Sequence, residues 1–130
     1  MILPYIIVSL SSCFYVYEFF LRVMPSVITN ELMIEFHVSA SLMSFMTASF
    51  LYAYAIMQIP SGLLCDRFGT RKVLSIAILV CAISTLVFQA THNFYFAILT
   101  RLAVGASAAC AFIVPLTLTA HWLPAKRFAL

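Results

Sequence analysis

The chain has 130 residues, of which 65% are hydrophobic and only 8% are charged, and its formal net charge is +3. Soluble domains carry about 25% charged residues, and no soluble core of this length could bury so much apolar surface. The composition therefore excludes a soluble globular domain and indicates an integral membrane protein in a lipid bilayer. A basic stripe is absent from the sequence, which excludes a nucleic-acid-binding protein.

Four apolar runs are each long enough to cross a hydrocarbon core, which needs roughly 20 helical residues. They predict an all-α membrane protein whose transmembrane helices cover about residues 2–27, 41–64, 73–90 and 94–118. A fifth run begins at about residue 127. The intervening segments, residues 30–39, 65–72, 91–93 and 121–127, are expected to be loops.

The basic residues of these loops are unevenly distributed. Three lie in residues 65–72 and two in residues 121–127, whereas residues 30–39 and 91–93 contain no Lys or Arg. Basic loops stay preferentially on the cytoplasmic side, so we expect both of them and the N-terminus to be cytoplasmic. The N-terminus has no basic region before its apolar run, which favours a first span over a cleaved signal peptide.

The first span carries polar residues at helical spacing. Glu18 and Arg22 form an (i, i+4) pair with the acid on the favourable N-terminal side. A single charge within a span costs about 2.5–3.5 kcal/mol on insertion scales, so such charges usually have a role. Two interpretations remain: a functional pair that lines a polar cavity, or a structural pair in which Arg22 reaches the outer surface. The other polar residues on the same face are Ser11, Tyr15 and Ser26.

The second span has its own polar face, which includes Tyr54 and Gln58. These two side chains are expected either to bond to neighbouring helices or to contact a substrate. The third span, residues 73–90, contains no charged residue and is expected to be a lipid-facing or scaffold helix.

The fourth span contains Arg101, about 10 Å deep in a helix that enters from the outer side. No acid lies in this span, so its partner is expected to be Glu18, a carbonyl group, a substrate anion or a residue outside this chain. Its role is either binding or proton coupling, or that of a structural counter-charge. Gly105 and the small residues after it allow a neighbouring helix to approach closely.

No feature of the sequence indicates catalysis. It has no paired nucleophile and base, no phosphate-binding loop and no cluster of metal ligands, so we expect no enzyme activity, cofactor or metal. The four cysteines stand singly and are expected to be small core residues: Cys13, Cys65, Cys81 and Cys110.

Residues 62–72 resemble the loop motif of the major facilitator superfamily between its second and third spans. That motif consists of Gly, three residues, Asp-Arg, one residue, Gly, and then basic residues. Its matching positions here are Gly62, Asp66, Arg67, Gly69 and Arg71. Thr70 departs from the pattern, because the family usually has a basic residue there.

Further segments strengthen this resemblance. Arg101 followed by Gly105 is similar to the family's fourth-helix motif, and residues 58–62 and 122–127 resemble its organic-anion branch. Residues 17–26 resemble bacterial nutrient permeases, including phagosomal amino-acid transporters.

The resemblance implies twelve spans in two halves, with this chain as the first third and the C-terminal part missing. It implies secondary active transport of a small polar solute, an amino acid or an organic anion, by alternating access in a bacterial inner membrane. Asp66 would belong to a cytoplasmic gate, and Arg101 would serve coupling or substrate binding. We expect proton coupling through Glu18, the only acid inside a predicted span.

Two other functions fit parts of the sequence. A four-helix exporter of the small multidrug type, working as a dimer, matches the length and a lone acid in the first span. The loop motif, Arg22 beside Glu18 and the fifth apolar run argue against it. A non-transporting membrane assembly subunit is the other candidate, and it predicts no convergence of polar faces from three helices.

Overall fold

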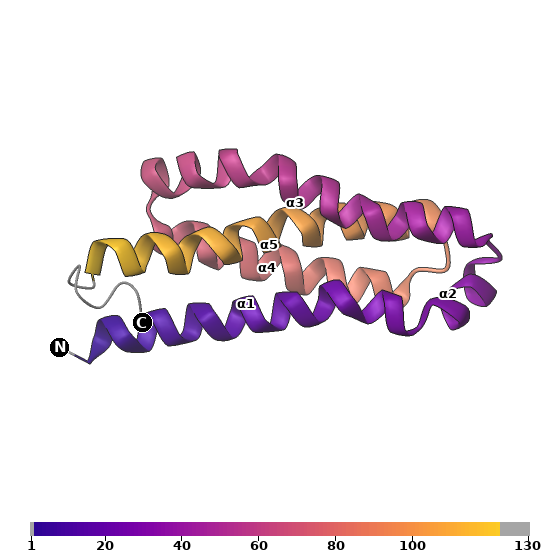
Figure 1. Cartoon of the computed structure of the whole chain (residues 1–130), viewed down its shortest axis with the longest axis horizontal. Helices are drawn as coiled ribbons and strands as arrows, with labels where there is room; N and C mark the ends of the chain where they lie inside the picture. Colours follow the sequence, from indigo (N-terminus) through magenta and orange to yellow (C-terminus); the bar gives the residue numbers. More distant parts are fainter. Residues whose placement is uncertain (1, 123–130) are drawn as a thin grey trace.

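The structure, a computed structural model, describes residues 2–122 and forms a bundle of helices (Figure 1). In chain order the helices are α1 (Leu3–Val27), α2 (Thr29–Phe36), α3 (Ala40–Phe68), α4 (Thr70–Ala90) and α5 (Phe94–Trp122). All except α2 are long and apolar enough to cross a membrane. The prediction of an all-α membrane protein with four spans is confirmed. The fifth span expected from about residue 127 lies outside the described residues.

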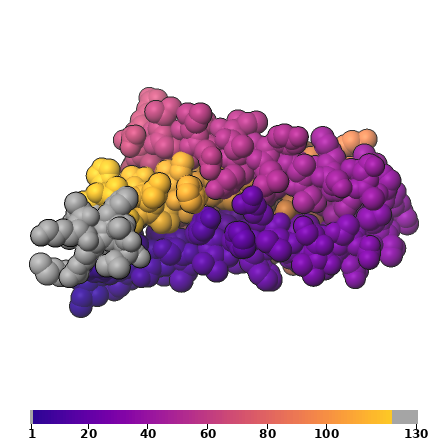
Figure 2. All heavy atoms as spheres, in the orientation of Figure 1, coloured from indigo at the N-terminus to yellow at the C-terminus, as the bar shows by residue number. Residues whose placement is uncertain are grey.

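Helix α5 is the centre of the bundle. In its most apolar stretch 61% of the residues are buried, against 17–22% in α1, α3 and α4. Helices α3 and α4 both pack mainly on α5 and make few contacts with each other. On the face shown in Figure 2, α1 and α3 cover most of α5, which is visible chiefly near its C-terminal end. The polar residues of α5 are therefore shielded, while α1, α3 and α4 expose large apolar faces.

The tightest packing between α3 and α5 occurs at Gly105. A Cβ atom at this position would collide with the carbonyl oxygen of Phe50 and would lie 3.1 Å from the Cβ atom of Ala53. The absence of a side chain thus lets the two backbones meet, as small residues do at membrane helix contacts.

The chain reverses between α3 and α4 more sharply than the sequence indicated. Residues 65–68, expected in a loop, continue α3, and α4 begins at Thr70, so Gly69 alone separates the two helices. Gly69 has φ 84° and ψ 145°, a conformation that side chains disfavour. Charged residues do not end a helix that leaves the hydrocarbon region, whereas a glycine at positive φ does.

The segment between the first two spans also differs from the prediction. Residues 29–36, of which residues 30–36 were expected in a loop, form the short helix α2. Leu32 and Phe36, four residues apart, are buried against α3, α4 and α5, while Glu31 and Glu35 remain exposed. The helix ends at His37, which is left-handed with φ 52°. The two acids had obscured this amphipathic pattern in the sequence.

The two ends of the bundle differ in character (Figure 1). The N-terminus and the turn at Gly69 lie at one end, here called the N-terminal end. Helix α2 and the connection between α4 and α5 lie at the other, here called the α2 end. Helix α5 continues past residue 118, its expected boundary, and reaches the N-terminal end.

Candidate functional site

The three charges predicted inside the spans gather in the middle of the bundle. Glu18 and Arg101 are almost fully buried, with 2% and 5% of their surfaces exposed, and Arg22 is half-buried. Helix α1 supplies Glu18 and Arg22, and α5 supplies Arg101. They form a polar cluster within apolar surroundings.

Glu18 points from α1 toward α5. Its Oε1 atom accepts a hydrogen bond from the hydroxyl group of Ser107 at 2.9 Å, and the thiol of Cys81 on α4 lies beside the carboxyl group. Its Oε2 atom is buried without a hydrogen-bond partner among the described residues. A buried polar atom left unpaired costs about 1–3 kcal/mol, so this oxygen is available to a proton or to a further donor.

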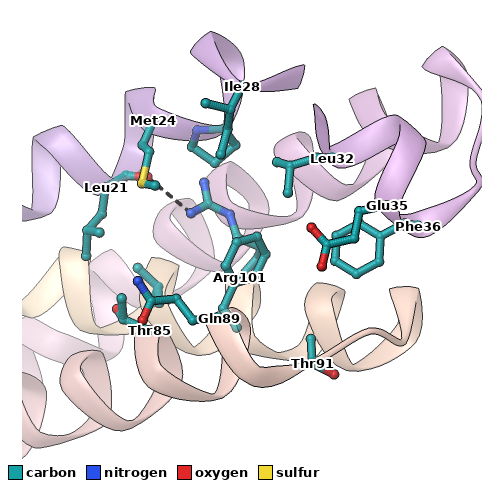
Figure 3. A pocket seen from close by; sticks show the side chains of 13 residues that line it. Leu21, Met24, Ile28, Leu32, Glu35, Phe36, Thr85, Gln89, Thr91 and Arg101 are labelled. Atoms are coloured by element: carbon teal, nitrogen blue, oxygen red, sulfur yellow. Dashed lines mark hydrogen bonds between the residues drawn. The ribbon is translucent and has the colours of Figure 1, made fainter. Parts of the chain in front are cut away.

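Arg101 is held from two sides. Its Nη1 atom donates to the carbonyl oxygen of Leu21 at 3.1 Å, shown as a dashed line in Figure 3. Its guanidinium carbon lies 5.1 Å from the ring centroid of Phe50, within cation–π distance. Of the partners considered from the sequence, a carbonyl group is thus one that Arg101 contacts.

The remaining edge of this guanidinium is free. Both Nε and Nη2 of Arg101 are buried without a hydrogen-bond partner in the described part of the chain. These two atoms form the side of a guanidinium that can grip a carboxylate with two parallel hydrogen bonds.

Arg22 does not form the expected ion pair with Glu18. Within residues 2–122 the one side-chain contact at ion-pair distance joins Nδ1 of His92 to Oε1 of Glu35, at 3.2 Å, and it is an ion pair only when His92 is protonated. The guanidinium group of Arg22 instead lies over Tyr54, 5.5 Å from its ring centroid, and 6.0 Å from that of Phe50. The prediction of the pair was wrong because aromatic faces on α3 attract Arg22, while Glu18 turns toward Ser107 on α5.

Phe50 is the residue of this cluster that the sequence analysis missed. Its ring stacks on that of Tyr54, with 6.4 Å between centroids and 7° between planes. The ring of Phe50 therefore contacts the guanidinium groups of Arg101 and Arg22 and also stacks on Tyr54. The (i, i+4) spacing of Phe50 and Tyr54 on the polar face of the second span was the available signal.

The three charged residues line two separate spaces. Glu18 and Arg22 line a small recess with Tyr54 and Phe50, with a volume of about 10 Å³, enough for about one water molecule. Arg101 lines a separate cavity of about 220 Å³ toward the α2 end. Gln58, predicted to join the site, lines neither space.

The Arg101 cavity contains polar residues that the sequence analysis did not assign to a site (Figure 3). Helix α4, expected to be a scaffold helix, contributes Thr85 and Gln89, and α2 contributes Glu35. Thr91 follows the end of α4 and completes the polar part of the lining. The cavity therefore has a buried cation and a carboxylate among apolar walls.

The predicted loop motif lies at the N-terminal end, away from the charge cluster. Asp66, Arg67 and Arg71 are exposed, and Gly69 makes the turn. A Cβ atom on Gly62 would meet nothing within 4 Å, so packing does not require glycine there. Asp66 borders a recess with Thr117 and His121 at the end of α5, and these side chains were not predicted to lie beside the motif.

The arrangement agrees with a comparison against known families. The family description Major Facilitator Superfamily matches residues 8–130. The chain belongs to the major facilitator superfamily. This assignment confirms the resemblance seen in the motifs at Gly62–Arg71 and Arg101–Gly105, and it decides against a four-helix multidrug-type exporter.

Curated relatives of the chain are named as transporters. "Uncharacterized transporter YybO" of Bacillus subtilis (strain 168) is 29% identical over 116 residues, covering 89% of this chain and 27% of the relative. "Probable galactarate/D-glucarate transporter GarP" of Escherichia coli (strain K12) is 30% identical over 112 residues, which cover 82% of this chain and 25% of the relative. "Probable sulfoacetate transporter SauU" of Cupriavidus necator is 27% identical over 103 residues, which cover 79% of this chain and 24% of the relative. No solved structure matches the chain significantly.

The chain thus spans about a quarter of the length of these relatives. It corresponds to helices of one half of a major facilitator protein, and its helices α1, α3, α4 and α5 are the four membrane-spanning candidates of the described region.

Proposed function

We propose that this chain forms the N-terminal part of a secondary transporter that moves a small organic anion across a membrane by alternating access. The observation that carries the proposal is the cluster of one buried guanidinium group (Arg101), one half-buried guanidinium group (Arg22) and one buried carboxyl group (Glu18). With Glu18 ionised the cluster bears one excess positive charge, and with Glu18 protonated it bears two. Buried charge of this kind needs compensation, which an anionic substrate would provide.

Arg101 is the proposed substrate residue. Its free Nε and Nη2 atoms offer a carboxylate two parallel hydrogen bonds, and the Leu21 carbonyl and the Phe50 ring fix the plane of the group. The names of the relatives support an anionic substrate, since galactarate, D-glucarate and sulfoacetate all carry acidic groups. We therefore favour an organic anion over an amino acid. Tyr54 and Arg22 would complete the site from the neighbouring recess.

Glu18 is the proposed proton carrier. It is the acid buried in the described spans, and its Oε2 atom has no hydrogen-bond partner there. Loss of its proton would lower the positive charge of the cluster and weaken the hold on an anion. Binding of proton and substrate would thus be linked, as cotransport requires.

Asp66 is proposed to act at a cytoplasmic gate, together with Gly62, Arg67, Gly69 and Arg71. The N-terminal end of the bundle would face the cytoplasm of a bacterial cell, with the protein in the inner membrane. The organisms of the relatives and the basic residues at this end support that placement. The gate would close against the other half that a transporter of this family is proposed to have.

The test is transport by the full-length protein, meaning the whole product of the reading frame, in reconstituted vesicles with and without a pH gradient. Galactarate, D-glucarate and sulfoacetate are the anions offered, and neutral amino acids are the comparison. Arg101→Lys keeps the positive charge but loses the guanidinium group, which can donate two parallel hydrogen bonds to a carboxylate. Anion uptake should therefore fall at least tenfold. Glu18→Gln should abolish accumulation driven by the pH gradient and leave exchange of substrate across the membrane.

Glu31→Gln is the control, because Glu31 is an exposed acid on α2 outside the cluster. It should transport as the parent does. Uptake of amino acids but not of the anions would refute the substrate class. Accumulation by Glu18→Gln against a gradient would show that the proton is carried elsewhere.

A further inference from the structure

An apolar groove lies between α3 and α4 over the surface of α5, and one of its lining residues, Ser107, also donates a hydrogen bond to Glu18 of the charge cluster. Its walls are Leu64 and Phe68 of α3 and Ile76 and Val80 of α4, and its floor includes Ala106 of α5. Its volume is about 360 Å³. The groove exists because α3 and α4 both pack on α5 but hardly on each other, and because small α5 side chains form the floor.

The length of the groove matches one leaflet of a bilayer. Along α3 it extends from Phe68 at the end of the helix to Met57, eleven residues away. At 1.5 Å per residue this is about 16 Å, and half of a hydrocarbon core of about 30 Å is about 15 Å. The groove therefore begins at one membrane surface and ends near the midplane, as a lipid acyl chain does.

The mouth of the groove is basic. Arg67, Arg71 and Lys72 are exposed around the turn at Gly69, and Asp66 is the one acid among them. The guanidinium carbon of Arg67 lies 5.6 Å from the ring centroid of Phe68, which itself lines the groove. Helix α4 starts here without a side-chain cap, so the backbone N–H groups of its first turn also favour a phosphate.

We propose that this groove binds an anionic phospholipid of the leaflet at the N-terminal end of the bundle. One acyl chain would lie between α3 and α4, and the phosphate would contact Arg67, Arg71 and Lys72. The combination of apolar walls, a depth of one leaflet and a cationic mouth is the complement of such a lipid. The proposal does not depend on which solute is transported.

The experiment uses the full-length protein in phosphatidylcholine nanodiscs that contain a phosphatidylglycerol probe with a photoreactive acyl chain. Labelled peptides are then mapped by mass spectrometry. We expect labels on the groove segments of α3 and α4, removed by excess phosphatidylglycerol and retained with excess phosphatidylcholine. Arg67→Gln and Arg71→Gln should each weaken phosphatidylglycerol competition about fivefold, since each basic residue near an anionic surface contributes about that factor.

Val80→Trp fills the groove from a partly exposed position and should reduce labelling several-fold. Leu79→Trp places the same side chain one position along α4, where Leu79 is 61% exposed and outside the groove, and should leave labelling unchanged. Equal competition by both lipids, or equal loss in both tryptophan variants, would overturn the proposal. So would cross-linking of Val80→Cys to a later segment of the chain, because the groove would then be filled by protein.

Discussion

At the scale of single residues, Phe50 and Gly105 determine how the charge cluster is built. Gly105 removes the side chain that would separate α5 from α3, and this brings Phe50 close enough to α5 for Arg101 to lie over its ring. The same ring also faces Arg22. A contact between two backbones thus places two cations near one aromatic ring, and neither cation requires Glu18 as a direct ion-pair partner.

The two helical glycines are expected to respond differently to substitution by alanine. Gly105→Ala forces a Cβ atom onto the Phe50 carbonyl oxygen and should destabilise the fold by about 1–3 kcal/mol, as overpacking does. Gly62→Ala meets nothing within 4 Å and should be neutral or stabilising by up to about 1 kcal/mol, because alanine favours a helix. The measurement is the thermal unfolding midpoint of the full-length protein in detergent. A midpoint for Gly105→Ala at or above that of Gly62→Ala would disprove the close approach.

At the scale of elements, the charged residues at the connection between α3 and α4 form no ion pairs with one another. No ion pair joins Asp66 to Arg67 or Arg71 within the described residues, and all three side chains are exposed. Exposed charges of this kind contribute little to stability. Any strong effect of changing Asp66 must therefore come from a partner outside this helix pair.

Asp66→Asn accordingly should reduce transport at least tenfold with little change in the amount of folded protein. The physical reason is that an amide of the same size keeps the local packing but cannot attract a cation or a helix N-terminus across the gate. Uptake into vesicles and the yield of monodisperse protein are measured together. Asp66→Glu, which keeps the charge, should restore part of the activity. Normal transport by the amide variant would remove Asp66 from the gate.

The same comparison of elements shows what the sequence could and could not predict. Apolar run length is enough to predict a span, because lipid imposes it, and all four spans are present. Helix ends were less predictable: charged residues 65–68 continue α3, and Leu32 and Phe36 fold residues 29–36 onto neighbouring helices. The burial of Glu18 and Arg101 could be predicted, because both residues lie inside apolar runs long enough to cross a membrane. The rotamer of Arg22 did not, since its aromatic partners come from a helix distant in sequence.

At the scale of the whole molecule, the two ends of the bundle carry opposite kinds of charge. The N-terminal end holds Arg67, Arg71 and Lys72, whereas the α2 end holds Glu31, Glu35 and histidines but no exposed Lys or Arg among the described residues. Lys126 and Arg127, counted with the basic loops in the sequence, lie outside the described residues. Such an asymmetry orients membrane proteins with the basic end in the cytoplasm. The orientation of the bundle in the membrane should therefore be measurable from one labelled position at each end.

Single cysteines at Ser39 and Thr70, at opposite ends of the bundle, test this orientation. Ser39 is exposed at the start of α3 beside α2, and Thr70 begins α4 at the N-terminal end. In a background with Cys13→Ser, which removes the exposed natural thiol, an impermeant maleimide on intact cells should label Ser39→Cys and not Thr70→Cys. Thr70→Cys should react only after the cells are permeabilised, which serves as its positive control. The reverse pattern would place the basic end outside, and the proposed cytoplasmic gate at Asp66 and the N-terminal leaflet of the lipid groove would then both face the exterior.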